Sequence, residues 1–367
     1  RQVRFSNNQV DITVAWDDYV TDVALAWKKR FVATQIHDFR DVDANIEKLL
    51  ELAKVSAENP MFGGFAKGDF HYASSKADRE LENLESPTDY VLEAIDAAEN
   101  EAGCKIDSGG ILFTKFEDVY LVSSEGPTGI DSRSAIELSI RAFSEREASG
   151  HGVECRSTLR DFKPARAGAK AGEIAKLAKN PKIGDEGVYD VIFDPLIFGS
   201  SLAVWGRMMS AFSVLIQQSV FVDKLGQKVA PDIVTLRDNP AAYSMSNRIF
   251  DDEGVPAKEN VLVDQGILKT YLHNASTAKL FETETTGNAG LISPTPWNVE
   301  IDGGNMSKDE LFADVKRGLY LTNTWYTRFQ NYAKGDFSTI PRDGIFLVEK
   351  GEIKQSLKDL RISDNAL

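Results

Sequence analysis

Residues 196–216 read LIFGSSLAVWGRMMSAFSVLI, the richest apolar stretch in the chain. Small and polar residues interrupt it, so neither it nor any other run approaches the ~20 consecutive apolar residues that cross a bilayer. The interrupting residues are Gly199, Ser200, Ser201, Gly206, Arg207, Ser210 and Ser213. Because Asp194-Pro195 is a favourable helix start, the stretch predicts a buried helix in a water-soluble protein.

Strands and tight turns dominate the sequence on either side of this helix. A strand is predicted over 188–193, just before it. Two hairpins are predicted to turn at 264–266 and 349–351, where Gly ends a polar triplet. We therefore predict a β-rich C-terminal domain with one buried helix, spanning residues 183–367.

The first half predicts a mixture of strands and helices. Residues 1–40 indicate a β-meander, because residues 10–16 alternate between apolar and polar and further strands are expected at 20–27 and 31–36. One helix is predicted over 42–57, and a second begins at Ser86-Pro87 and ends at Gly103. Later strands are expected at 110–116, 118–123, 134–143 and 152–159.

A Gly-, Ala- and Lys-rich stretch over 164–182 predicts a connecting helix, and Asn180-Pro181 breaks the chain near its end. We place the domain boundary there, which gives a mixed α/β N-terminal domain over residues 1–182. The predicted fold class is α+β.

Composition limits the kind of function. The chain has 367 residues, enough for about two domains, and a formal charge of -14. Such an acidic surface repels phosphate backbones, so direct nucleic-acid binding is not expected, and the basic stretch at 163–182 is interpreted as a solvated helix face. Two cysteines and no basic-then-apolar leader favour a cytoplasmic protein.

Common catalytic motifs are absent from the sequence. It contains no Gly-x-Ser-x-Gly nucleophile elbow, no P-loop and no dinucleotide-binding fingerprint. The four histidines are far apart, and the only local group of metal-ligating types is His151, Glu154 and Cys155. On a strand, His151 and Glu154 point to opposite faces, so we interpret the group as a strand-end histidine and a buried thiol.

A series of blocks in the second half carries a specific pattern in its order and spacing. The blocks are DDEGVP at 251–256, QGILKTYL at 265–272, TTGNA at 285–289, GLYLT at 318–322, GDF at 335–337, GIFLVEKGEI at 344–353 and RISDN at 361–365. Together they resemble the core signature of the TldD/PmbA family, and the first half resembles it more loosely. Family members run longer at both ends, so the resemblance implies a trimmed or partly ordered chain.

The resemblance implies a test for catalytic competence. TldD-like members carry His-Glu-x-x-x-His on the helix after the second domain's first strand, as a peptidase zinc site. Here the motif positions fall on Leu202, Ala203 and Arg207, and residues 196–216 contain no His, Cys, Asp or Glu. The chain therefore lacks both the zinc ligands and the carboxylate base, as TldE/PmbA-like members do.

By resemblance, the leading hypothesis is a non-catalytic TldE-like subunit that pairs with a zinc-bearing TldD-like chain in a peptidase complex. No cofactor is expected in this chain, and zinc is expected in the partner. Its role would be to complete a shared chamber and hold extended peptide, through an exposed strand edge. The candidate lining residues are Thr285, Thr286, Gly287, Asn288, Ala289, Arg328, Phe329, Gly335, Asp336 and Phe337. The alternative interpretation, which we favour, is that these residues form turns between strands.

Three other hypotheses stay open. One is a homodimeric peptide-binding or regulatory protein without a proteolytic role. Another is an active hydrolase that depends on His151 or Glu154, so whether the chain is itself an enzyme is left undecided. The family's older label as a modulator of DNA gyrase suggests a DNA-linked role, against which the acidic charge argues.

Overall fold

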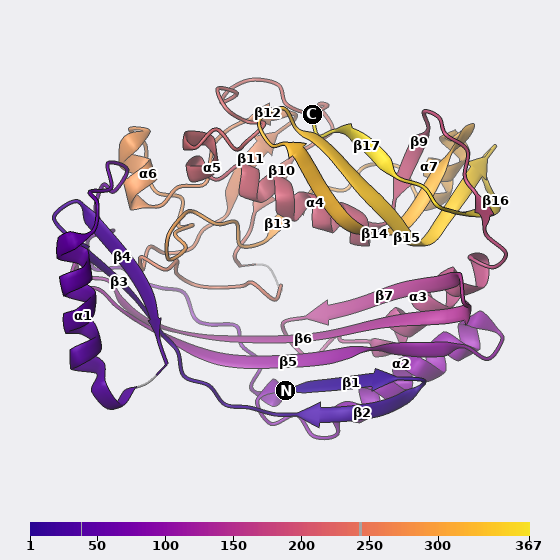
Figure 1. Ribbon diagram of the computed structural model, residues 1–367, viewed down its shortest axis with the longest axis horizontal. Helices are drawn as coiled ribbons and strands as arrows, with labels where there is room; N and C mark the ends of the chain where they lie inside the picture. The colour runs from indigo at the N-terminus through magenta and orange to yellow at the C-terminus, as the bar shows by residue number, and fades with distance from the viewer. Residues whose placement is uncertain (38, 242–243) are drawn as a thin grey trace.

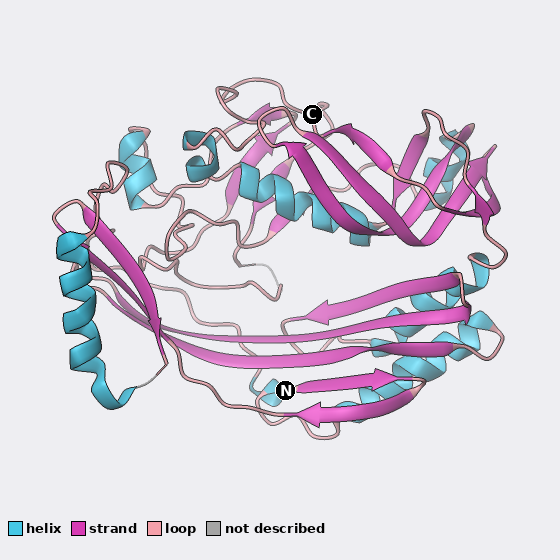
Figure 2. Ribbon diagram, viewed as in Figure 1, coloured by secondary structure: helices cyan, strands magenta, loops and turns pink. Residues whose placement is uncertain are grey.

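The computed structural model describes residues 1–37, 39–241 and 244–367. Their strands form sheets in both halves of the chain (Figures 1 and 2), so the predicted α+β class is confirmed. Among the described residues, no helix is both long and apolar enough to cross a lipid bilayer.

The N-terminal half is built on a five-stranded antiparallel sheet in the order β2-β1-β5-β6-β7. Its strands are β1 (Gln2–Ser6), β2 (Gln9–Val14), β5 (Asp107–Val122), β6 (Thr128–Glu145) and β7 (Ala148–Arg156). One face is covered by α2 (Pro87–Ala102) and α3 (Pro164–Leu177), and a short 3₁₀ helix (Arg79–Leu81) precedes α2. The two strands expected at 110–116 and 118–123 are a single strand, β5, because Glu117 continues the pairing with β6.

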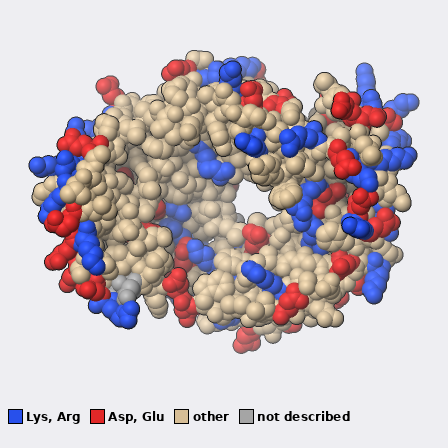
Figure 3. All heavy atoms as spheres, in the orientation of Figure 1, with Lys and Arg blue, Asp and Glu red and all other residues tan. Residues whose placement is uncertain are grey.

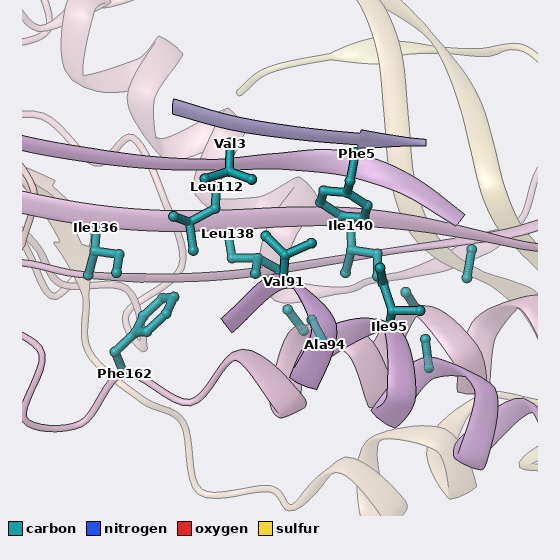
Figure 4. Close-up of a cluster of buried hydrophobic side chains, with 14 of the residues drawn as sticks. Val3, Phe5, Val91, Ala94, Ile95, Leu112, Ile136, Leu138, Ile140 and Phe162 are labelled. Atoms are coloured by element: carbon teal, nitrogen blue, oxygen red, sulfur yellow. The ribbon is translucent and has the colours of Figure 1, made fainter. Parts of the chain in front are cut away.

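The core of this half comes from alternate residues of the sheet and one face of α2 (Figure 4). Val3, Leu112 and Leu138 point from three strands toward Val91 and Ile95 of α2, and all five side chains are buried. Alternate residues of the strands and residues spaced three or four apart on α2 therefore pack together in one apolar layer.

The helix α3 is more than a connector, because it packs closely on the sheet. A Cβ on Gly150 or Gly152 of β7 would lie 2.1 Å from the Ala171 oxygen or 2.0 Å from the Ala167 oxygen. These contacts need glycine, since any side chain there would push the helix away from the strand. The basic residues Lys163, Arg166 and Lys176 are exposed, as the predicted solvated face requires, while the opposite face of α3 is buried against the sheet.

An arm projects from the sheet. It consists of β3 (Thr21–Trp27), β4 (Arg30–Ile36), a 3₁₀ turn (Phe39–Asp41) and α1 (Val42–Val55). The strands predicted at 10–16, 20–27 and 31–36 exist, but β2 pairs with β1 while β3 pairs only with β4. The meander is therefore divided between two sheets: β2 is the edge strand of the main sheet next to β1, and β3 and β4 form a two-stranded sheet of their own.

The C-terminal half contains two further sheets. The larger has the order β8-β16-β15-β14-β9, with β17 also paired to β15, and the smaller has the order β12-β11-β10-β13. The larger sheet comprises β8 (Lys182–Ile183), β9 (Asp190–Phe193), β14 (Arg317–Asn331), β15 (Asp336–Glu349), β16 (Glu352–Lys358) and β17 (Ile362–Asn365). The smaller comprises β10 (Leu236–Asp238), β11 (Asn260–Asp264), β12 (Ile267–Leu268) and β13 (Val299–Ile301). The helices are α4 (Pro195–Met208), α5 (Ala211–Leu215), α6 (Ala275–Leu280) and α7 (Lys308–Asp314).

Both predicted hairpin turns are confirmed. Gln265 and Gly266 have φ of 47° and 80°, and Lys350 and Gly351 have φ of 51° and 82°. Two consecutive positive φ values match the twist of the flanking strands, which explains the glycine at the second position of each turn.

The two halves contact each other at both ends and leave an opening between them, which Figure 3 shows passing through the molecule. At one end, Ala148 and Ile174 pack with Tyr320, Phe346 and Val348. At the other, beside the arm, the Tyr72 hydroxyl donates to the Gly254 carbonyl at 2.7 Å and the Tyr72 ring packs on Phe250. The described chain therefore forms a ring.

Candidate functional site

The helix α4 lies on the side of the C-terminal half that is turned toward the N-terminal half (Figure 1). Asp194 caps it by accepting a hydrogen bond from the Leu196 amide, as the sequence predicts. Its inner face buries Ile197, Leu202, Gly206 and Met208. Its outer face, meaning the face directed away from the core of the C-terminal half, exposes Gly199, Ser200, Ala203 and Arg207.

The helix is thus half buried, which corrects the prediction of one buried helix over 196–216. It also ends early. Ser210 is extended (φ -63°, ψ 129°), forms an isolated bridge with Leu272, and donates its hydroxyl to the Pro294 carbonyl at 2.8 Å. These contacts stop the helix at Met208, and α5 starts anew at Ala211.

The positions of the zinc motif do not fit a metal ion. Leu202 is only 7% exposed, and Ala203 and Arg207 lie on the outer face. Apolar groups have no lone pairs for a cation, and a guanidinium repels one. Within residues 1–37, 39–241 and 244–367, no group of three His, Cys, Asp or Glu could hold a metal ion.

His151 lies at the end of the ring where β7 meets β14 and β15. Its ring nitrogens lie 2.8 Å from Ser139 Oγ and 3.0 Å from Asn323 Nδ2. Glu154 is on the other face of the strand and pairs with Arg156 at 2.8 Å. The opposite orientation of His151 and Glu154 is confirmed, so the two side chains cannot act on one substrate atom.

Ser139 and His151 lie as close together as a catalytic nucleophile and its base. The proton of the neutral histidine ring, however, is on the wrong nitrogen for that role. Asn323 Oδ1 accepts from the Thr324 amide, and its Nδ2 donates to Asp343 at 2.8 Å. Because the amide nitrogen therefore faces His151 Nδ1, that ring atom accepts and Nε2–H donates to Ser139. A base needs the reverse tautomer at the serine.

The surroundings of His151 also keep the ring neutral. Burial, followed by the nearby Arg141 charge, lowers the pKa of His151 below its ordinary value. Arg141 forms an ion pair with Asp343 at 3.0 Å, and Ser149 donates to the same carboxylate at 2.7 Å. We interpret this network as a set of polar contacts that hold the two halves of the chain together at this end of the ring.

The first candidate lining segment is buried in the C-terminal half. Thr286, Gly287, Asn288 and Ala289 are buried, and only Thr285 is partly exposed. The Asn288 amide donates to Asp238 at 2.6 Å and to the Thr295 carbonyl at 3.0 Å. The Asn288 amide is therefore bonded within the chain, in a segment that lies between α6 and β13.

The second candidate segment is the tip of a long hairpin, not a loop. Arg328 and Phe329 belong to β14, and Asp336 and Phe337 belong to β15. Asp336 pairs with Asn365 of β17, and Gly335 has φ of 82° at the turn. Arg328 and Asp336 are exposed, whereas the Phe329 and Phe337 rings pack together at 5.8 Å.

Sequence reasoning missed the aromatic surface of this hairpin. Trp325, Tyr326 and Tyr332 are 61%, 59% and 49% exposed. Beyond Leu321, where its pairing with β9 stops, the outer edge of β14 faces no other strand among the described residues. Bulky apolar side chains on a strand are usually half buried, so the sequence alone gave no sign that these three are exposed. Their exposure follows from which strands pair with β14, which only the structure shows.

Family models match most of the chain. The model described as the PmbA/TldA metallopeptidase C-terminal domain matches residues 186–367, and the central-domain model matches residues 76–179. The chain belongs to the PmbA/TldD family. The expected resemblance is confirmed.

Individual relatives agree with this family. A metalloprotease of Methanocaldococcus jannaschii is 36% identical over 189 residues, 50% of this chain and 42% of the relative. A metalloprotease TldD homologue of Haemophilus influenzae is 26% identical over 269 residues, 67% of this chain and 55% of the relative. The chain therefore spans about half the length of the curated relatives it matches.

Solved structures share the fold. TldE from Thermococcus kodakarensis superposes with a TM-score of 0.86 at 20% identity, covering 99% of this chain and 85% of that one. A Thermotoga maritima protein described as a modulator of DNA gyrase gives 0.83 at 23% identity, with coverage of 99% and 85%.

Proposed function

We propose that this chain is a non-catalytic, TldE-like subunit that pairs with a zinc-bearing TldD-like chain in a peptidase complex. The observation that carries the proposal is the outer face of α4. By resemblance, the family's His-Glu-x-x-x-His motif falls on Leu202, Ala203 and Arg207, and here Leu202 is buried while Ala203 and Arg207 are exposed. A subunit of this fold without the side chains of that motif depends on another chain for the chemical step.

The chain's part in the complex would be to hold extended peptide. The free edge of β14 beyond Leu321 offers unpaired backbone donors and acceptors to an added strand. Trp325 and Tyr326 lie beside that edge and offer apolar contact. Of the two candidate lining segments, the tip containing Arg328, Phe329, Gly335, Asp336 and Phe337 is the better one, because Thr286 to Ala289 are buried.

The test is reconstitution. The chain and a TldD-like homologue from the same cell are purified separately and together, and zinc content and cleavage of an unfolded peptide are measured. We expect a stable complex with about one zinc ion per partner chain, and cleavage only when the partner is present. Full peptidase activity with bound zinc in this chain alone would overturn the proposal.

A matched control separates pairing from catalysis. The homologue with its metal-site glutamate changed to glutamine should still pair but should not cleave. Stable self-association with no complex would instead favour a homodimeric peptide-binding or regulatory protein.

A further inference from the structure

A cavity of about 100 Å³ lies where the arm meets the C-terminal half. Phe31, Phe62 and Phe65 line it from the arm side, and Phe212, Glu253 and Ser276 line it from the other. Ala24 and Ile292, also in its lining, are exposed, so the cavity is accessible from solvent. It is separate from α4's outer face and from the β14–β15 tip.

Three aromatic rings form one wall of this cavity. The ring centroids of Phe31 and Phe62 are 5.4 Å apart, those of Phe62 and Phe65 are 5.2 Å apart, and those of Phe31 and Phe65 are 6.0 Å apart. The face of each ring carries partial negative charge and attracts a cation, while the same face packs well against an alkyl chain.

Glu253 supplies a carboxylate without a counter-ion. Its Oε2 accepts from the Ala275 amide at 3.0 Å, and it forms no ion pair within the described part of the chain. Its neighbour Asp252 differs, because Arg248 lies 3.6 Å away. Lys279 of α6 donates to the Gly63 carbonyl at 3.3 Å instead.

The pKa of the Glu253 carboxyl reflects this environment. Burial, and then the charges of Asp251 and Asp252, raise the pKa of Glu253 to about 7. A carboxyl held this way takes up a proton near neutral pH because no positive group compensates its charge. A bound cation would supply that charge and favour the ionised form.

We propose that the cavity binds an alkylammonium group, with its charge near Glu253 and its alkyl stem against the phenylalanine rings. The group could belong to the amino terminus of a peptide or to a lysine side chain, which share this chemistry. The carboxylates exclude anions. The inference concerns this chain alone and does not depend on the proposed pairing with a zinc-bearing partner.

The first experiment compares a cation with its neutral analogue. The purified chain is titrated with n-butylammonium and with n-butanol at pH 8, with binding followed by nuclear magnetic resonance. We expect n-butylammonium to bind at least about ten-fold more tightly. Equal affinity for the two probes would overturn the proposal, and this comparison requires no variant.

The pH dependence gives an independent measurement. The affinity for n-butylammonium should fall several-fold between pH 8 and pH 6, because Glu253 takes up a proton in that range. The charged groups around it are Asp251, Asp252 with Arg248, and Lys279. An affinity that is unchanged over this range would contradict a role for the carboxylate.

Two variants of the lining and one control variant locate the binding. Glu253→Gln keeps an oxygen for the Ala275 amide but removes the charge, and it should weaken n-butylammonium binding about ten-fold. Glu284→Gln, an exposed glutamate outside the lining, removes the same charge and should change nothing. Phe62→Leu keeps apolar volume without the ring face and should weaken binding about three-fold.

The source of the ammonium group is identified with two peptides. One has a free amino terminus and no lysine, and the other is N-acetylated and contains one lysine. Glu253-dependent binding of the first indicates recognition of a peptide terminus, and of the second a lysine side chain. Binding of n-butylammonium that is as strong in Glu253→Gln as in the wild type would refute the site.

Discussion

Residues 285–289 and the tip of the β14–β15 hairpin both consist largely of polar and turn-forming residues, yet the fold places them in opposite environments. Asn288 is fully buried and its amide is bound to Asp238 and Thr295. Arg328 is exposed, and no ion pair holds it among the residues that the structure describes.

This difference distinguishes polar groups that stabilise the fold from polar groups that are free to bind a ligand. A buried amide with all its partners inside the chain stabilises the fold and offers nothing to a ligand. An exposed side chain beside an unpaired strand edge contributes little to stability and is free to contact a peptide. The predictions below test this contrast.

The largest effect is expected from Asn288→Ala. It removes three buried hydrogen bonds, to Asp238, Asn260 and the Thr295 carbonyl, so the free energy of unfolding should fall by about 3 kcal/mol at about 1 kcal/mol for each bond. Asn331→Ala at the exposed hairpin tip is the matched change and should cost less than about 0.5 kcal/mol. Denaturant unfolding measures both, and similar losses would contradict the contrast.

A second comparison uses one glycine with positive φ from each region, Gly287 and Gly335. A Cβ at Gly287 would lie 2.6 Å from the Pro256 carbonyl oxygen, whereas at Gly335 the nearest atom is a Val220 methyl at 2.8 Å. A methyl group can move aside more easily than backbone. Gly287→Ala should therefore lower the free energy of unfolding by about 2 kcal/mol, and Gly335→Ala by about 1 kcal/mol. The reverse order in thermal unfolding would show that the tip is the more rigid region.

The cavity residue Glu253 should make the stability of the chain depend on pH. Because the pKa of Glu253 is raised from 4.5 to about 7, the folded chain binds more protons than the unfolded one, and this group's stabilisation is lost as pH rises from about 4.5 to about 7. For a partly exposed carboxyl this corresponds to about 2 kcal/mol. Relative to the wild type, Glu253→Gln should gain stability over that range. A constant difference between pH 4.5 and pH 7.5 would exclude this linkage.

The smallest stability effect is expected at Arg328. Arg328→Ala should change the free energy of unfolding by less than about 0.5 kcal/mol but weaken binding of an extended peptide about three-fold. Lys316→Ala removes an equal charge from an exposed position just before β14 and should leave peptide affinity unchanged. Fluorescence anisotropy with a labelled peptide distinguishes the two. Equal weakening in both would indicate a general charge effect.

The sequence by itself determined the local structure of this protein. The turns at Gln265-Gly266 and Lys350-Gly351, the start of α2 at Pro87 and the start of α4 after Asp194 depend on neighbouring residues and backbone preferences. The absence of the usual zinc ligands from 196–216 is also a property of sequence alone, because folding cannot supply a His, Cys, Asp or Glu side chain that the stretch lacks.

Only the tertiary structure decided which of these elements meet. Strand pairing separates β2 from β3, ring closure brings Asn323 to His151, and one cavity brings Phe31 of the arm and Phe62 and Phe65 of the following segment together with Glu253. Whether a polar residue is buried, as Asn288 is, or exposed, as Arg328 is, depends on contacts between segments far apart in sequence. Such contacts form through burial of apolar surface across the whole chain, and local residue patterns do not specify them.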